Sequence, residues 1–439
     1  MPKLLYVRIV PRPQSRFAVA LLTAWLAGCG ARPGMDADHD ASGPNIDPPD
    51  AGQPVGPPDA EVLPPGCHWV GGARHQITEP PSDKGLHDLE VSDDAVLLAW
   101  KTTNPDPPHD NTRYVQRVTW EGVPIGEREA LFPPPSGWTS YAGVSLATGP
   151  DHHGAILWEE NTGCRFTQTD QDGVALGSLQ YVDPELCTSL RSTPSGFSLF
   201  TRAGAENERH LLRLNTTGGV MHRSEPIEAI SLGGYWWATL ALHGGDYLVA
   251  GIHENLEPMP IVTQRIDAWG APLNAPTVIH TSHTDARRIQ LVDTGGGILA
   301  GWLSADAPDS PTQQQFLTLQ RLDTQGQPLG EPFRAADVQA YRDGGWSLTR
   351  KADRVLAVVV NPLEPDSYGD ATALVLLVFD LAGNLVEPPV ELTRIRFARD
   401  PRMRPTPAGV IVGFEGMPEA TPHQIFALSA RCEVDVLPD

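Results

Sequence analysis

Six aspartates form the most conspicuous set of potential ligands in this sequence. They are spread in pairs over three long, Pro-containing segments, 102–113, 304–315 and 361–372, and they are Asp106, Asp110, Asp306, Asp309, Asp366 and Asp370. Carboxylate oxygens are the ligands that calcium prefers, so these segments could hold calcium or a cationic ligand. The spacing matches no known calcium loop, and solvated acidic turns are the simpler interpretation. We therefore expect no obligatory cofactor, with calcium as the alternative.

Sequence motifs of the common enzyme classes are missing. There is no Gly-x-Ser-x-Gly, His-Glu-x-x-His, phosphate-binding loop or dinucleotide fingerprint. Glu159 and Glu160 are paired carboxylates, but neighbouring residues of a strand point to opposite faces and cannot flank one bond. We therefore assign no catalytic residue.

A recurring turn indicates the repeated strands that must position any site. A short polar residue stands three positions before a glycine, and this signature turn lies in six segments: 117–126, 168–177, 213–222, 265–274, 321–330 and 378–387. Successive glycines are 51, 45, 52, 56 and 57 residues apart. A repeat of that length is typical of solenoids and propellers.

Each signature turn has the chemistry of a β-hairpin. The Asp, Asn or Thr side chain can accept hydrogen bonds from backbone amides two to four residues later, and the glycine tolerates positive φ. An apolar residue three positions after the glycine is expected to return the chain to the core. These residues are Ile125, Leu176, Met221, Leu273, Leu329 and Val386.

Seven short apolar runs recur between the turns, at 95–100, 155–158, 196–200, 247–252, 298–303, 354–360 and 410–414. A run that is apolar on both faces suits a strand between packed sheets. The sequence therefore predicts an all-β fold, a seven-bladed β-propeller of four-stranded antiparallel blades, with six or eight blades as alternatives. Alternation of strands places the three long acidic loops on one face and the signature turns on the other.

Four cysteines suggest how the ring closes. The last repeat, at 423–436, lacks the signature turn, and 67–78 resembles a lone outer strand. We expect this N-terminal strand to complete the last blade, with Cys67 bonded to Cys432 and Cys164 bonded locally to Cys187 across a third-to-fourth-strand hairpin. Four cysteines allow three connectivities, so the pairing is a hypothesis.

The N-terminus has the features of an export signal. Four basic residues precede an apolar run at 17–27, which is too short to span a membrane. Leu26-Ala27-Gly28-Cys29 resembles a bacterial lipobox. We expect a signal peptide at 1–28, then a lipidated Cys29 with a disordered Pro/Asp-rich linker at 29–66, and a propeller domain at 67–439.

Charge limits the possible partners. The chain has a net charge of −22, which disfavours nucleic acid. We expect a monomer that is held to the membrane by its lipid anchor.

The chain resembles secreted lipoproteins of Gram-negative bacteria of the myxobacterial type, with β-propeller-like repeats. The lipobox (26–29), the linker (30–66) and repeats such as 298–330 carry this resemblance. It implies an outer-membrane location and no catalytic residues. We expect a recognition or scaffold lipoprotein that binds a protein or glycan through its long-loop face. The alternative is a propeller hydrolase or lyase that acts on an envelope or extracellular polymer.

Overall fold

The computed structural model describes residue 63 and residues 67–434, apart from 80–82, 93, 104–111, 133–141, 150–152, 160–162, 185, 204–207, 232–236, 243, 254–255, 257, 283–285, 306–313, 342–344, 364–370 and 419–421. The chain divides into two compact units, Met1–Pro54 and Val55–Asp439, and every described residue belongs to the second. Within these residues no helix has the length and apolar character needed to cross a membrane.

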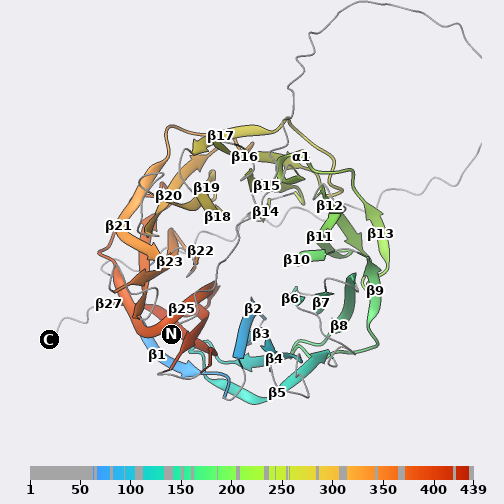
Figure 1. Ribbon diagram of the computed structural model, residues 1–439, viewed down its shortest axis with the longest axis horizontal. Coiled ribbons are helices and arrows are strands. Elements are labelled where there is room, and N and C mark those ends of the chain that lie inside the picture. Colours follow the sequence, from blue (N-terminus) through green and yellow to red (C-terminus); the bar gives the residue numbers. More distant parts are fainter. Residues whose placement is uncertain are drawn as a thin grey trace, which may run out of the picture. The chain divides into compact units, whose positions relative to one another are not determined.

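Five separate four-stranded antiparallel sheets are arranged as blades of a ring (Figure 1). In chain order their strands are β2 (Asp83–Val91), β3 (Val96–Thr103), β4 (Arg113–Val118), β5 (Pro124–Phe132); β6 (Ala142–Ala147), β7 (His153–Glu159), β8 (Gly163–Thr169), β9 (Gln180–Asp183); β10 (Leu186–Thr193), β11 (Gly196–Ala203), β12 (Glu208–Leu214), β13 (Val220–Arg223); β14 (Trp237–Ala241), β15 (Tyr247–Ile252), β16 (Met259–Ile266), β17 (Thr277–Ser282); and β18 (Ala286–Asp293), β19 (Ile298–Ser304), β20 (Gln314–Leu322), β21 (Phe333–Tyr341). One short helix, α1 (Glu228–Ser231), lies between β13 and β14. The first strand of each blade is innermost and the fourth is outermost (Figure 1).

The other strands form one seven-stranded sheet, in the order β1-β27-β26-β25-β24-β23-β22. Its strands are β1 (Cys67–Gln76), β22 (Trp346–Lys351), β23 (Arg354–Pro362), β24 (Thr372–Asp380), β25 (Val390–Thr406), β26 (Gly409–Met417) and β27 (Gln424–Val434). The predicted seven four-stranded blades are therefore wrong in number, because only five are separate. The reason is β25, which pairs with β24 through its first residues and continues without a loop to pair with β26 through the rest.

The core lies between neighbouring sheets. All seven predicted apolar runs fall within the second strands, β3, β7, β11, β15, β19, β23 and β26. Trp100 and Trp302 are completely buried. Phe166 of β8 packs on Phe197 of β11, with ring centroids 4.9 Å apart across two sheets. Packing between blades thus explains why these strands are apolar on both faces.

The signature turns have the predicted hydrogen bonds. Asp170 Oδ1 accepts from the amides of Asp172 and Val174, both at 2.9 Å, and Asp267, Asp323, Asp380 and Asn215 do the same in their own turns. The six glycines have φ between 82° and 89°. The predicted return of the next apolar residue to the core is wrong, however: Leu176 is 63% exposed and Leu273 is 50% exposed.

The N-terminal strand closes the ring as predicted. β1 pairs antiparallel with β27, and Cys67 is bonded to Cys432. Cys164 is bonded to Cys187, but the location differs from the prediction. The bond joins β8 to β10, the innermost strand of the next blade, rather than two strands of one hairpin.

Candidate functional site

A cavity of about 520 Å³ lies at the centre of the ring, and we call it the channel. Its lining comes from the seven innermost strands, β2, β6, β10, β14, β18, β22 and β25. Each contributes only two to four residues, so no single segment of sequence contains the site.

Charged side chains line the channel from three of these strands, and two of the strands contribute a pair each. Asp88 and Glu90 are two residues apart on β2, and Arg402 and Arg404 have the same spacing on β25. Residues separated by two on a strand share a face. Both pairs therefore point to the channel, while Leu89 and Met403 between them are completely buried in the core.

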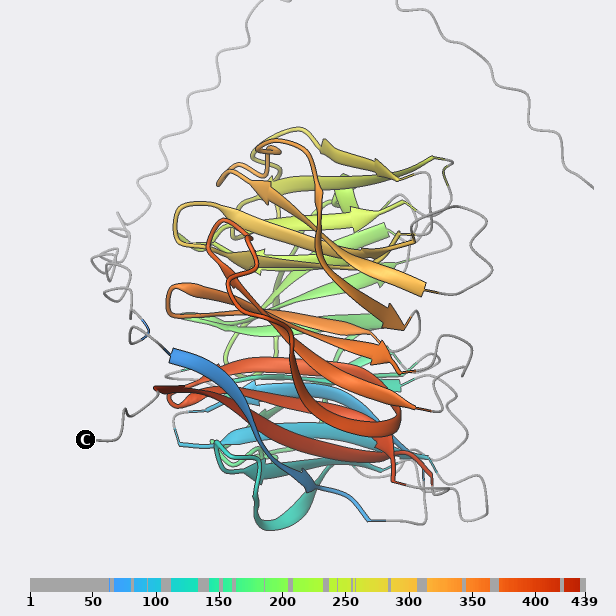
Figure 2. The same cartoon turned by 90° about the vertical axis from the view of Figure 1, so that its left-hand side faces the viewer.

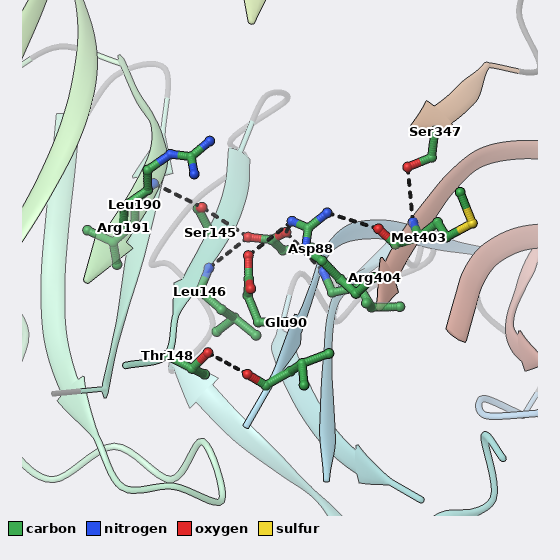
Figure 3. Close-up of polar contacts among 12 residues, drawn as sticks. Asp88, Glu90, Ser145, Leu146, Thr148, Leu190, Arg191, Ser347, Met403 and Arg404 are labelled. Carbon is green, nitrogen blue, oxygen red and sulfur yellow. Dashed lines mark hydrogen bonds and ion pairs between the residues drawn. The ribbon is translucent and has the colours of Figure 1, made fainter. Parts of the chain in front are cut away.

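Arg404 bridges both carboxylates (Figure 3). Its Nη2 lies 3.0 Å from Glu90 Oε1 and 3.8 Å from Asp88 Oδ1. Burial raises the pKa of Glu90, and Glu90 in turn raises the pKa of Arg404. A proton is thus held more tightly at Glu90 than at an ordinary glutamate, although the arginine opposes this effect.

Asp88 also joins two blades. Its Oδ2 accepts from Ser145 Oγ at 3.0 Å and from the Leu146 amide at 2.9 Å (Figure 3). Ser145 Oγ then accepts from the Leu190 amide of the following blade at 3.2 Å. The same arrangement recurs where Gln290 accepts from Leu348 N and Ser347 accepts from Met403 N. Asp88 is therefore a structural link, and Glu90 is the carboxylate with oxygen capacity left for a ligand.

Two further guanidinium groups line the channel. Arg191 Nη2 donates to the Thr239 carbonyl at 2.9 Å, while its Nε is buried and has no hydrogen-bond partner. Burial lowers the pKa of Arg191. Arg402 is exposed and faces the cavity. In the part of the chain that the structure describes, neither Arg191 nor Arg402 forms an ion pair.

A second charged cluster lies where the innermost strands begin. Glu415 accepts from the Leu86 amide at 2.8 Å and pairs with Arg399 Nε at 2.5 Å. Burial, reinforced by Asp400, raises the pKa of Glu415 to about 7. Burial and the nearby cations lower the pKa of His87 to about 3, so this imidazole is neutral at neutral pH.

The backbone is strained in three of the innermost strands, β10, β18 and β25. Ser189, Arg288 and Asp400 have φ of 58°, 55° and 47°, and each lies at an irregularity of strand pairing. Arg288 Nη1 also binds Asp400 Oδ1 at 2.5 Å, which joins β18 to β25. Left-handed non-glycine residues and bulges are common beside functional sites. Of these three residues, Ser189 lines the channel, whereas Arg288 and Asp400 bind each other.

The structure does not test the ligand and lipidation residues predicted from the sequence. Asp106, Asp110, Asp306, Asp309, Asp366 and Asp370, and the lipidation residue Cys29, are outside the described residues. Among the residues that are described, no group of three or more His, Cys, Asp or Glu side chains could hold a metal ion.

Sequence reasoning missed Glu90, Arg191, Arg402 and Arg404. A signal was present, because 88–90 and 402–404 each place two like charges around one apolar residue. Charges at alternate positions of one strand share a face, so each pair meets the same surroundings. Only the assignment of those segments as innermost strands would have given the pattern this meaning.

No family model matches this sequence, and a comparison with curated proteins finds none that is similar. Solved structures do match. The endosialidase of phage phi92 is 9% identical, with a TM-score of 0.50, and the match covers 84% of this chain and 70% of the enzyme.

Two other structures match with lower TM-scores. A protein of unknown function from Dyadobacter fermentans is 12% identical, with a TM-score of 0.46, over 84% of this chain and all of its own. A puromycin-hydrolysing peptidase of Mycobacterium tuberculosis is 13% identical, with a TM-score of 0.49, over 81% of this chain and 54% of its own. At such identities the likeness is evidence of fold alone. This chain is therefore an all-β protein with a β-propeller fold.

Proposed function

We propose that this protein is an exported, lipid-anchored propeller that recognises an acidic glycan, and that an acidic group of the glycan enters the channel. The observation that carries this proposal is the pair Arg191 and Arg402, two guanidinium groups that line a central cavity without an ion-pair partner among the described residues. Arg404 is largely neutralised by Glu90 and Asp88. The channel therefore carries excess positive charge in a chain whose net charge is −22.

The chemistry of the lining suits a sugar acid. A planar guanidinium binds a carboxylate through two parallel hydrogen bonds. Hydroxyl groups that can bind sugar hydroxyls surround the arginines, and they belong to Ser145, Thr188, Ser189, Thr239 and Thr349. A volume of about 520 Å³ is within the range of small-molecule sites. It accommodates the end of a chain or one sugar group rather than a folded partner.

The left-handed residues of the innermost strands lie toward the face predicted to bind ligands. The three long loops connect β3 to β4, β19 to β20 and β23 to β24. These connections are on the side where the first strand of each blade begins, close to Ser189, Arg288 and Asp400. The loops themselves lie outside the described residues, and we propose that they contact the part of the glycan that remains outside the channel.

The proposed location follows from the sequence and the disulfides. Two disulfides suit an oxidising compartment outside the cytoplasm. We propose that cleavage precedes Cys29, that this residue carries the lipid, and that the protein is a monomer at the outer membrane. Mass spectrometry of the envelope-bound N-terminal peptide tests this, and an unmodified Cys29 would refute the anchor.

Equilibrium binding tests the ligand. We expect an oligosaccharide of uronic acids to bind more tightly than a neutral oligosaccharide of the same length. Arg402→Gln and Arg191→Gln should each weaken binding by about tenfold or more, the loss of one charge-assisted contact. Arg394→Gln is the matched control, because Arg394 lies on β25 away from the channel and is 67% exposed. Equal affinity for the acidic and neutral sugars would refute the proposal.

A hydrolase is the second candidate, and Glu90 is the observation that favours it. A glutamic acid of raised pKa beside a cation is a typical proton donor in glycan cleavage. One protein of the same fold is described as an endosialidase. Chain-length analysis of acidic polysaccharides after incubation distinguishes the two. A hydrolase shortens the chains, and Glu90→Gln stops cleavage while binding remains; a recognition protein leaves the chains intact.

A further inference from the structure

Exposed apolar side chains are concentrated on the signature turns. Of the 15 large hydrophobic residues that are exposed in the described chain, ten lie in these turns. They are Val123, Val174, Leu176, Val220, Met221, Trp269, Leu273, Leu329, Leu385 and Val386. Every blade that has a described signature turn contributes at least one, so they form a ring on one face of the propeller, which we call the apolar rim.

The fold does not require apolar residues at these positions. The amides of Leu176, Leu273 and Leu329 donate to carbonyls of the preceding strand at 2.8–2.9 Å, bonds that any residue except proline forms. The Asx oxygen and the glycine supply the rest of the turn chemistry. The three leucine side chains remain 49–63% exposed. Trp269 packs against Arg213 and His222, but the apolar character of the leucines requires a reason outside the folded chain.

The N-terminal segment joins the propeller on this same face. Cys67, the first residue of β1, pairs with Val434 at the end of β27. Leu63 N donates to Asp353 Oδ1, at 3.4 Å, in the tight turn between β22 and β23. In a four-stranded meander, the turn between the first two strands and the turn between the last two lie at the same end of the blade. The Asp353 turn and the signature turns are therefore on one face. Figure 2 shows the start of β1 on the side of the coloured tight turns.

We propose that the apolar rim rests on a lipid surface. The tips of turns around one face of a ring present a flat, annular contact, which suits a planar partner rather than a globular one. Trp269, half exposed at the tip of its turn, has the side-chain type that partitions to the boundary of headgroups and acyl chains. The charge of −22 selects zwitterionic over anionic lipid.

This orientation turns the long-loop face away from the membrane. Leu63 and Cys67, at the start of the described chain, then lie on the side nearest to the bilayer. The rim contacts lipid directly, so this orientation depends neither on the acyl chain nor on which ligand the channel binds.

Flotation with phosphatidylcholine vesicles tests the proposal. The chain from residue 29 onward, carrying Cys29→Ser, excludes contributions from the apolar segment 17–27 and from an acyl chain. We expect measurable partitioning. Replacement of Leu176, Leu273 and Leu329 by Ser should lower the partition coefficient at least tenfold, since about half of three leucine side chains would no longer contact lipid.

A matched control replaces three apolar residues of similar fractional exposure that lie outside the signature turns. Leu176, Leu273 and Leu329 are 63%, 50% and 49% exposed. Tyr181, Val278 and Leu256, which lie outside the signature turns, are 61%, 54% and 49% exposed. Replacement of these three by Ser should leave partitioning within a factor of two. Far-ultraviolet circular dichroism verifies that both triple variants fold.

A second measurement follows one side chain. Brominated phosphatidylcholine should quench part of the tryptophan emission of the bound protein, and Trp269→Phe should remove that part. The absence of partitioning, an equal loss in both triple variants, or quenching that persists in Trp269→Phe would each overturn the proposal. Sedimentation of the unaltered protein as a dimer that Leu176→Ser dissociates would assign the rim to a second copy of the chain instead.

Discussion

Loss of the ring-closing disulfide should destabilise the protein more than loss of the local one. Cys67 and Cys432 are 365 residues apart, whereas Cys164 and Cys187 are 23 apart. A crosslink restricts the unfolded chain in proportion to the logarithm of the loop that it closes. The entropy relation gives about 6 kcal/mol for the long loop and about 3 kcal/mol for the short one.

The native structure supports the assignment of this difference to the unfolded state. β1 remains paired with β27 over most of its length without the bond, and Trp69 stays buried in the core. Thr78 Oγ1 and the Gln424 side chain also join the two segments at 3.0 Å. The folded ring therefore has other contacts that hold its closing strand, and the free energy should be lost mainly through a less restricted denatured chain.

Guanidinium denaturation of the two double Ser variants, followed by tryptophan fluorescence, measures both free energies of unfolding. We expect Cys67→Ser/Cys432→Ser to be less stable than Cys164→Ser/Cys187→Ser by about 2 to 3 kcal/mol. The unaltered protein in a reductant should be less stable than either double variant, because it lacks both bonds. An equal or larger loss from the local pair would refute the reasoning, and would instead indicate that the link between β8 and β10 supports native packing.

Three further predictions concern particular side chains. Glu415 has a pKa of about 7 in the folded protein against a usual value of 4.5, so the native state binds more protons between these values and stability should fall as pH rises through them, by up to about 3 kcal/mol. Denaturation at several pH values should show this slope, and Glu415→Gln should flatten it; an unchanged slope would assign the effect to another group. Asp88→Ala leaves two blade-joining donors without their acceptor and should cost about 2 to 4 kcal/mol in chemical denaturation, with Asp88→Asn less harmful; equal losses would contradict the hydrogen-bond interpretation. Gly218→Ala, where φ is 89° and a Cβ would lie 2.2 Å from Phe166 Cδ1, should cost about 2 to 4 kcal/mol, whereas Gly177→Ala meets no atom within 4 Å and should leave the melting temperature nearly unchanged; similar melting of both would refute the steric argument.

Local chemistry made much of the fold predictable. The signature turns need an Asx oxygen and a glycine with positive φ, and both are visible in the sequence. The apolar runs identified the second strand of each repeat. The number of separate blades was wrong because β25 continues through the place where a loop was expected. Its 17 residues contain Asp400-Pro401, a dipeptide that usually marks a turn, yet the strand runs through it.

The channel was not predictable in the same way. Glu90, Arg191 and Arg404 are far apart in the chain, and each is an ordinary charged residue in its own strand. The sequence directed attention to the acidic loops because their composition is unusual. Charge inside the ring depends on which strand of each blade is innermost, and composition carries no information about that order.

The sequence by itself determined the all-β class and the hairpin turns, because both depend on residues that interact locally; it suggested the closure of the ring and the cysteine pairs, which the structure contains. Tertiary structure alone decided which charges meet in the channel and which apolar residues remain on the rim. Both are properties of a closed ring: seven strands converge on one axis, so their side chains become neighbours only after closure, while the turns on one face are left at the same height.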